Sequence, residues 1–145
     1  MAAEDKKTPV PPLIFDTDIL IWFLRKDAAA AEFIAQVPLA ERNISSLTYL
    51  ELLYGCKSRK DLIHVRQLVA DAFAEVVPLT ETITLSAQQL MERFVLWRRP
   101  DAADVLIAAT ALNRREALAT ANRKHFDFVP GLDVSIFKPS QRRGS

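Results

Sequence analysis

The sequence predicts a three-layer α/β/α fold around a small, mostly parallel central sheet of four to five strands. Short apolar runs alternate along the chain with helical segments, and no hairpin signal connects consecutive runs. This pattern favours a parallel sheet covered by helices on both faces. Half of the 145 residues are hydrophobic, which is enough for one substantial core. We expect a single domain over residues 13–138, between a flexible leader at 1–12 and a flexible tail at 139–145.

The first half of the chain is organised around the run Leu13-Ile14-Phe15, which ends at Asp16. A short continuous apolar run followed by a polar turn is typical of a buried strand in a parallel sheet. The segments expected after it are helices over 19–25 and 28–37, a strand over 44–46 and a helix over 47–57. In the last of these helices, Leu50, Leu53 and Tyr54 share one side.

The second half continues the alternation. Apolar residues recur at helical spacing over 60–73, which predicts an amphipathic helix. A third strand is expected over 75–79, and Pro78 either ends it or places it at a sheet edge. The remaining elements are a helix over 81–97 capped by Thr80, a helix opened by residues 101–104 and running through 114, a strand over 118–120 and a fifth strand over 134–137.

The charge is unevenly distributed, although the formal net charge is only +1. Residues 1–92 contain nine basic against thirteen acidic side chains, whereas residues 93–145 contain ten basic against five acidic ones. Such a chain can hold cations in one region and polyanions in another. A solvated surface of mixed charge would give the same totals.

Cysteine usage and the N-terminal sequence indicate the compartment. Cys56 is the only cysteine, so no intramolecular disulfide can form, and a reducing cytosol is the natural environment. Residues 4–7 are charged and lead to prolines, not to the apolar segment of a signal peptide. No uncharged apolar run approaches the length of a membrane span. We therefore expect a cytoplasmic protein that makes no membrane contact.

Acidic side chains follow the expected strands or open the expected helices. Asp16 ends the first strand, Glu51 falls in the expected first turn of the helix after the second strand, and Asp104 heads an almost wholly apolar helix. Ligands of open α/β sheets bind at the carboxyl ends of the strands, so these carboxylates are expected in one crevice. Their mutual repulsion would raise at least one pKa, and a hard divalent cation such as Mg²⁺ or Mn²⁺ would relieve it.

Each acid also has a purely structural interpretation. Asp16 or Asp18 can cap the helix that follows. Thr48 and Glu51 match a capping box, in which the two side chains bond to each other's backbone N–H groups. Asp101 is the expected cap of the apolar helix. This leaves Asp104, in the first turn of that helix, free to bind a ligand.

Four segments resemble the successive signatures of PIN domains, and especially of the VapC type of toxin in bacterial toxin–antitoxin pairs. These segments are Phe15–Leu20, Ser46–Gly55, Asp104–Leu112 and Thr120–Phe126. The resemblance implies a PIN-like fold and a metal-dependent endoribonuclease. It implies that Asp16, Glu51 and Asp104 are the core acids, which hold Mg²⁺, or Mn²⁺, directly or through waters. An activated water would then attack an RNA phosphodiester in line.

Other residues take supporting roles by the same resemblance. Thr17 or Ser46 would support the water network, and Asp18 and Thr120 belong to the supporting set. The family often has Asn where this chain has Asp18, which either adds a carboxylate or caps the helix. It often has Asp where this chain has Asn122, whose default role is in a turn. Asn122 would reach a metal through a water, which weakens the case for a second firmly bound ion.

Basic residues near the acidic segments are candidates for contacts with RNA phosphates. Arg123 and Lys124 lie in the last of the four segments, and Arg98 and Arg99 precede the third. His125 could be a general base, but a water activated by a metal needs no histidine. The resemblance also implies an RNA substrate, a cognate VapB-like antitoxin whose tail covers the acidic crevice, and a homodimer, heterotetramer or higher complex with that antitoxin.

Two other functions fit parts of the sequence. Asp16-Thr17-Asp18 after an apolar strand also matches haloacid dehalogenase-like phosphatases, in which Asp16 would be the nucleophile and Asp18 the acid/base. That interpretation leaves Glu51 without a role, and no convincing lysine precedes Asp101. The second alternative is a non-catalytic interaction domain whose acids only bind a cation, and it would bind metal without turnover.

Overall fold

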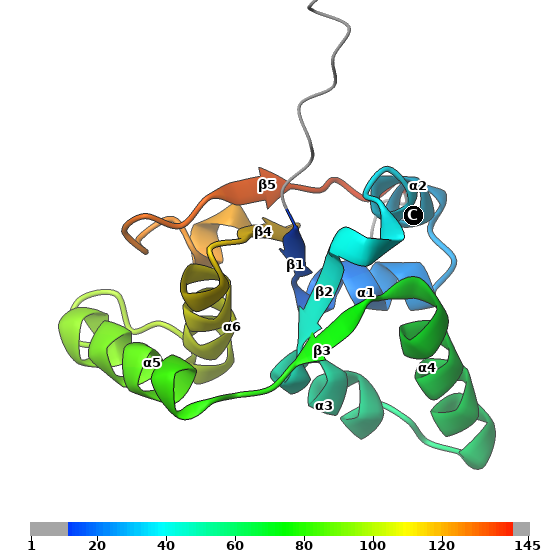
Figure 1. Ribbon diagram of the computed structural model, residues 1–145, viewed down its shortest axis with the longest axis horizontal. Coiled ribbons are helices and arrows are strands. Elements are labelled where there is room, and N and C mark those ends of the chain that lie inside the picture. The colour runs from blue at the N-terminus through cyan, green and yellow to red at the C-terminus, as the bar shows by residue number, and fades with distance from the viewer. Residues whose placement is uncertain (1–11, 141–145) are drawn as a thin grey trace, which may run out of the picture.

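The computed structural model of the chain describes residues 12–140 and has a five-stranded parallel sheet at its centre (Figure 1). The strands are β1 (Leu13–Phe15), β2 (Arg42–Ser45), β3 (Glu75–Val77), β4 (Ala117–Thr120) and β5 (Val134–Ile136). Their spatial order is β3-β2-β1-β4-β5, and all neighbours are parallel. Most of the predicted leader and tail, residues 1–11 and 141–145, lies outside the described residues.

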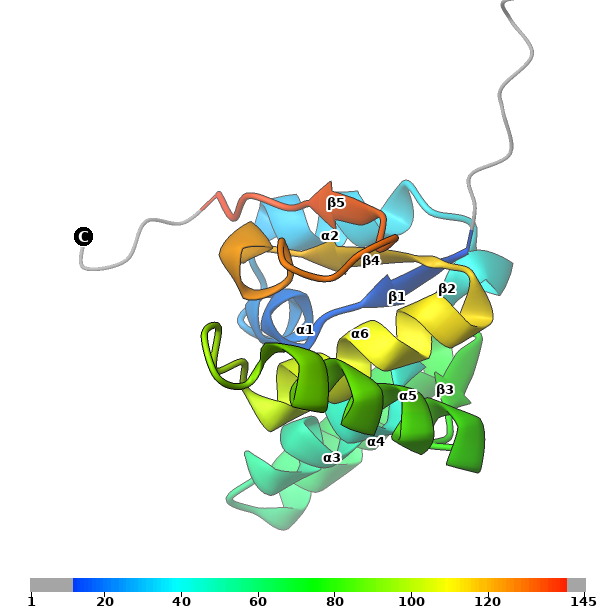
Figure 2. The same cartoon turned by 90° about the vertical axis from the view of Figure 1, so that its left-hand side faces the viewer.

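Helices cover both faces of this sheet. They are α1 (Thr17–Leu24), α2 (Ala28–Ala35), α3 (Ser46–Tyr54), α4 (Arg59–Ala72), α5 (Glu81–Phe94) and α6 (Ala102–Arg114), with short 3-10 helices η2 (Leu39–Glu41) and η3 (Arg123–His125). Helices α5 and α6 pack together on one face, and α1 to α4 enclose the core on the other (Figures 1 and 2). The predicted three-layer α/β/α fold is confirmed.

The side chains of β1 explain why the sheet has two cores. Leu13 and Phe15 belong to the core under α1 to α4, whereas Ile14 belongs to the core under α5 and α6. All three residues are 7% exposed or less. Successive side chains of a strand face opposite sides, so a strand covered on both faces needs a continuous apolar run.

Several predicted boundaries shift in the structure. The helix expected over 81–97 ends at Phe94, and residues 95–98 form turns before α6. The second strand begins at Arg42, two residues earlier than expected, and Asn43 already pairs with Glu75 of β3. Strand β3 lies at the sheet edge, as Pro78 predicts. Thr80 caps α5, because its Oγ1 accepts a hydrogen bond from the N–H of Ile83 at 3.2 Å.

The connections bring helix N-termini to the carboxyl ends of the central strands. Strand β1 leads directly into α1, β2 leads directly into α3, and η3 follows β4 closely. This arrangement collects polar side chains at one end of the sheet. Within residues 12–140, no helix is both long enough and apolar enough to cross a membrane.

Candidate active site

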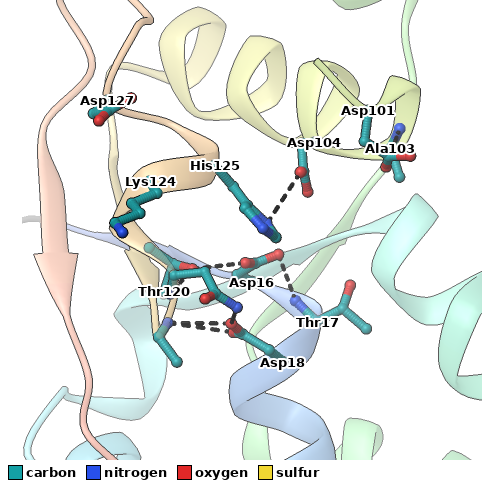
Figure 3. Close-up of polar contacts among 12 residues, drawn as sticks. Asp16, Thr17, Asp18, Asp101, Ala103, Asp104, Thr120, Lys124, His125 and Asp127 are labelled. Atoms are coloured by element: carbon teal, nitrogen blue, oxygen red, sulfur yellow. Dashed lines mark hydrogen bonds and ion pairs between the residues drawn. The ribbon is translucent and has the colours of Figure 1, made fainter. Parts of the chain in front are cut away.

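Asp16 lies where β1 ends and α1 begins. Its Oδ1 accepts a hydrogen bond from the N–H of Thr17 at 2.8 Å, so Asp16 is the N-cap of α1, as one interpretation of the sequence predicts. Its Oδ2 accepts a second bond from the hydroxyl of Thr120 at 2.7 Å, because β4 lies beside β1 (Figure 3). Asp16 is only 5% exposed, and these two donors fix its carboxylate.

Asp18, in the first turn of α1, connects that helix to the turn after β4. Its Oδ2 accepts bonds at 3.3 Å from the N–H of Ala121 and from the side-chain amide of Asn122. Thr120 holds the same turn, because its Oγ1 accepts from the N–H of Asn122 at 3.0 Å. The amide of Asn122 is therefore kept at the edge of the site by a carboxylate from another element.

Glu51 reaches the site from the second turn of α3. The helix begins at Ser46, and Ser45 caps it, because Ser45 Oγ accepts from the N–H of Leu47 at 3.1 Å. Thr48 and Glu51 both lie inside the helix, so the predicted capping box is wrong. Ser45 provides a cap three residues earlier and leaves the side chains of Thr48 and Glu51 free for other contacts.

Those contacts join α3 to α1. The Thr17 hydroxyl donates a bond of 2.6 Å to Oε1 of Glu51. Its oxygen lies 2.9 Å from the hydroxyl oxygen of Thr48, which is fully buried. Thr17, which follows the capping residue Asp16, thus holds the carboxylate of Glu51 in place.

Asp104 lies in the first turn of α6, and Asp101 is the N-cap of that helix, as predicted. The Oδ2 of Asp101 accepts from the N–H of Ala103 at 3.1 Å. The Oδ2 of Asp104 lies 3.3 Å from Nδ1 of His125, the last residue of η3 (Figure 3). The Asp104 side chain is 18% exposed and that of His125 is 54% exposed, so this pair stands at the mouth of the site.

A cavity of about 240 Å³ lies among these groups. Its lining includes five carboxylates, those of Asp16, Asp18, Glu51, Asp101 and Asp104. They come from the N-terminal regions of α1 and α6 and from the second turn of α3. We name this space the carboxylate cavity.

The cavity disfavours the accumulation of negative charge. Burial, and next the charge of Asp18, raises the pKa of Asp16 from 3.8 to about 7, although hydrogen bonds from Thr120 and Thr17 oppose the shift. Burial raises the pKa of Asp104 from 3.8 to about 6, against the opposing effect of His125. Burial also raises the pKa of Asp18. Protons or a cation must therefore balance these carboxylates near neutral pH.

The donor chemistry fits a hard divalent cation. Carboxylate oxygens are the ligands that Mg²⁺ and Mn²⁺ prefer. Within residues 12–140, no group of three or more His, Cys, Asp or Glu side chains is already closed around a metal position. Glu51 bonds to Thr17 through Oε1, and Asp104 pairs with His125 through Oδ2. Asp16, Glu51 and Asp104 are the residues that could hold an ion here while these contacts position the latter two.

Comparison with known proteins identifies the family. The sequence model of the PIN domain matches residues 13–131. The chain belongs to the PIN domain family. A comparison with curated proteins gives no match.

Solved structures share the fold of this PIN domain. A toxin–antitoxin complex from Klebsiella pneumoniae is 27% identical, with a TM-score of 0.71 over 86% of this chain and 95% of that chain. DNA-bound VapBC from Salmonella typhimurium is 22% identical, with a TM-score of 0.77 over 88% and 98%. VapBC-1 from nontypeable Haemophilus influenzae is 23% identical, with a TM-score of 0.71 over 86% and 96%.

Among the basic residues of the PIN domain predicted to contact RNA, Arg98 is already engaged. Its guanidinium pairs with the carboxylate of Asp127 and donates a bond of 2.6 Å to the carbonyl of Lys124. It also lies 5.3 Å from the ring centroid of Phe128. Arg98 therefore fastens the segment after α5 to the segment around η3. Arg99 and Lys124 are exposed, and within residues 12–140 their side chains have no hydrogen bond or ion pair.

The other predicted residues differ in how closely they reach the cavity. Ser46 opens α3 but does not line the carboxylate cavity, and its neighbour Ser45 does the capping. Arg123 is exposed in η3, again outside the cavity lining. Thr48 was missed as a site residue. The pair Ser45-Ser46 is the signal that could have revealed it, since serine is the stronger N-cap and moves the start of the helix.

The apolar side predicted for the helix over 47–57 is largely exposed in the PIN domain. Leu50 is 57% exposed and Tyr54 is 92% exposed, whereas Leu53 is partly buried. Leu50 and Tyr54 line a cavity of about 610 Å³ together with Ile21 and Glu51. Apolar surface therefore begins directly beside the carboxylate cavity.

Proposed function

We propose that this PIN domain is a VapC-type toxin, a metal-dependent endoribonuclease that hydrolyses RNA phosphodiester bonds and is inhibited by a cognate antitoxin. The observation that carries the proposal is the convergence of Asp16, Glu51 and Asp104 on one cavity from α1, α3 and α6. Mg²⁺ is the cofactor this donor set favours, with Mn²⁺ as the alternative. Such an ion, when bound, polarises the phosphoryl group and activates a water.

The residues of the chain would prepare the site in different ways. Asp16 is the most rigid of the three proposed ligands, because two donors hold its oxygens. Thr17 orients Glu51, and His125 keeps Asp104 in place at the mouth. Asn122, which Asp18 holds at the cavity edge, would reach the ion through a water.

Cleavage of a total RNA pool tests this function directly. We expect fragments with the wild-type protein in Mg²⁺, none in EDTA, and a loss of about a hundredfold or more for Asp104→Asn, the scale seen when one transition-state contact is removed. Asp71→Asn is the matched control, because Asp71 is exposed on α4 and its side chain bonds, within residues 12–140, only to Gln67. Circular dichroism should report the same fold for all three proteins.

The same assay tests the partner and the alternatives. Addition of the co-expressed antitoxin should suppress cleavage. Unchanged cleavage would count against the proposal that an antitoxin inhibits this protein. Well-folded, partner-free protein that binds Mn²⁺ without cleaving RNA would be the cation-binding interaction domain. Protein that instead hydrolyses small phosphate esters would be a phosphatase.

The phosphatase alternative has a structural weakness. It requires Asp18 to be the acid/base, but the Asp18 carboxylate is bonded to the turn at Ala121 and Asn122. Glu51 lines the same cavity as Asp16 and has no role in that scheme, so this lining supports hydrolysis by water.

Apolar surface beside the carboxylate cavity supports an antitoxin as the partner. A cavity of about 420 Å³ between α1, α3 and α4 is lined by Leu24, Leu52 and Val65. It shares Ile21 and Glu51 with the cavity of about 610 Å³ that Tyr54 lines. An antitoxin tail could bury apolar side chains there and extend an arginine or lysine to the carboxylates. The structural neighbours include toxin–antitoxin complexes, which is consistent with such a partner. We further propose a cytoplasmic location and a homodimer or heterotetramer.

A further inference from the structure

A second cavity, of about 270 Å³, adjoins the carboxylate cavity. The two spaces share Asp101, Asp104 and His125 in their walls, so one extended ligand could contact both. The rest of the second cavity is formed by residues after α5 and around η3, namely Arg98, Arg99, Pro100, Lys124 and Phe128. We name it the Arg99 cavity.

The charge changes sign between the two cavities. The carboxylate cavity has five acids in its lining and one basic residue, His125. The Arg99 cavity adds two arginines and one lysine to the acids that it shares. An RNA strand carries a phosphate at every nucleotide, so the phosphate next to the scissile one must lie close to whichever groups border the acidic site.

Only part of this positive charge can bind a ligand. Arg98 is used by Asp127, by the carbonyl of Lys124 and by the ring of Phe128, so it forms the wall of the cavity. In Figure 3 the ammonium of Lys124 points away from the Asp104–His125 pair. Arg99 is exposed, and its guanidinium has no partner among residues 12–140. Arg99 therefore combines a guanidinium that is unpartnered within the described chain with a place in the cavity wall beside the shared acids.

The backbone of Arg99 has a conformation that residues other than glycine adopt uncommonly. Its φ is 49°, in the left-handed region, and its N–H donates to the carbonyl of Phe94 at 3.4 Å where α5 ends. Glycine is the residue that normally fills this position after a helix, because other side chains are strained there. Lys26 and Arg115 also have a positive φ, so the conformation alone assigns no function. What supports a function for Arg99 is its place in the lining of the Arg99 cavity.

We propose that Arg99 binds the phosphate adjacent to the scissile phosphate of the same RNA strand and so positions the substrate. The inference rests on the proposed ribonuclease function. A planar guanidinium can donate two parallel hydrogen bonds to one phosphate, which fixes its orientation as well as its place. The strand would then run from the Arg99 cavity into the carboxylate cavity in one direction.

Binding of a short labelled single-stranded RNA in EDTA, followed by fluorescence anisotropy, tests this contact without turnover. We expect Arg99→Gln to lower the affinity about tenfold at low salt, the scale of one charged hydrogen bond. The slope of log affinity against log salt should fall by about 0.7, the value for one phosphate contact on a single strand. Arg66→Gln, which removes an equal charge from the exposed side of α4, should change neither quantity.

Two further comparisons make the test specific. Arg99→Gly relieves the backbone strain, so it should keep or raise the melting temperature and still lose the affinity. In Mg²⁺, replacing single phosphates of the RNA by uncharged methylphosphonates should slow wild-type cleavage at one position beside the cleaved bond. Cleavage by Arg99→Gln should not be slowed further by a methylphosphonate at that position. At every other position the variant should respond as the wild type does.

The outcomes separate this contact from the nuclease itself. Equal affinity and equal salt slope for wild type and Arg99→Gln would overturn the proposal, as would equal methylphosphonate effects in both. A variant that loses only dimer or antitoxin affinity would overturn it too, because Arg99 would then belong to a protein interface. RNA that binds through Arg99 but stays intact in Mg²⁺ would refute the nuclease function and support the phosphate contact.

Discussion

Single side chains at this site combine a structural bond with a place in the cavity. Asp16 caps α1 and lines the carboxylate cavity, and Asp18 holds the turn at Asn122 while lining the same space. Thr17, the residue after this cap, donates a hydrogen bond to Glu51. The hydroxyls can therefore be changed to test positioning without removing any proposed ligand.

Thr17→Val should lower RNA cleavage by about tenfold, equivalent to about 1.4 kcal/mol of transition-state stabilisation. The valine has the shape of threonine but cannot donate the 2.6 Å bond to Glu51, so that exposed carboxylate gains freedom. Thr17→Ser keeps the hydroxyl and should retain activity. Cleavage rates and urea unfolding of both variants measure the effect. If Thr17→Ser loses as much activity as Thr17→Val, the methyl group and not the hydrogen bond is what matters.

At the level of elements, a polar network fixes the opposite end of the sheet. Arg114, at the end of α6, makes two bonds to Glu75 of β3, at 2.6 and 3.2 Å, and one of 3.1 Å to Glu116 before β4. Asn43 of β2 donates to Glu116 at 3.0 Å. The network therefore joins three strands and a helix at the amino ends of the strands, away from the carboxylate cavity.

Arg114→Met should lower the free energy of unfolding by about 1–3 kcal/mol, because it leaves a buried carboxylate without its charged donor. Glu116 is only 9% exposed and would keep only the amide of Asn43 among its side-chain partners in the described chain. Urea unfolding measures the loss. Arg115→Met removes the same charge from an exposed neighbour and should have little effect. RNA cleavage at low temperature should be unchanged in both, and selective loss of cleavage in Arg114→Met would show that the network serves the site.

For the whole molecule, the alternation of strands and helices was enough to predict the layers and the parallel sheet. Positions at a strand end or in an expected first helical turn also predicted that Asp16, Glu51 and Asp104 would approach one another at the ligand-binding edge of the sheet. Local caps at Asp101 and Thr80 followed from residue type alone. These features depend on residues close together in sequence or on the handedness rules of the fold.

The missed features depend on contacts between distant segments. Thr120 meets Asp16 across 104 positions, and Arg98 meets Asp127 across 29. The first pair exists because the order β3-β2-β1-β4-β5 places β4 beside β1, and strand patterns do not specify that order. The Thr17–Thr48 contact was hidden for a second reason, because the motif around Thr48 matched a local capping box.

The pH dependence of unfolding follows from the same convergence of acids. The pKa of Asp16 is about 7 in the folded protein against 3.8 as the ordinary value. Between these values the folded state binds more protons than the unfolded state, so the free energy of unfolding falls as pH rises from about 4 to about 7. The contribution of this group, on the order of 4 kcal/mol, is fully present below pH 4 and lost above pH 7.

We therefore expect the protein in EDTA to be less stable to urea at pH 8 than at pH 5. Asp16→Asn keeps a capping side chain but cannot ionise, so it should weaken this dependence, to which Asp104 and Asp18 also contribute. Mg²⁺ should stabilise the wild type more at pH 8 than at pH 5, because a cation binds the ionised carboxylates, and it should stabilise Asp16→Asn much less. Parallel pH profiles for the two proteins would mean that Asp16 ionises equally easily in the folded and unfolded states. The carboxylate cavity would then lack the uncompensated charge that makes it a metal site.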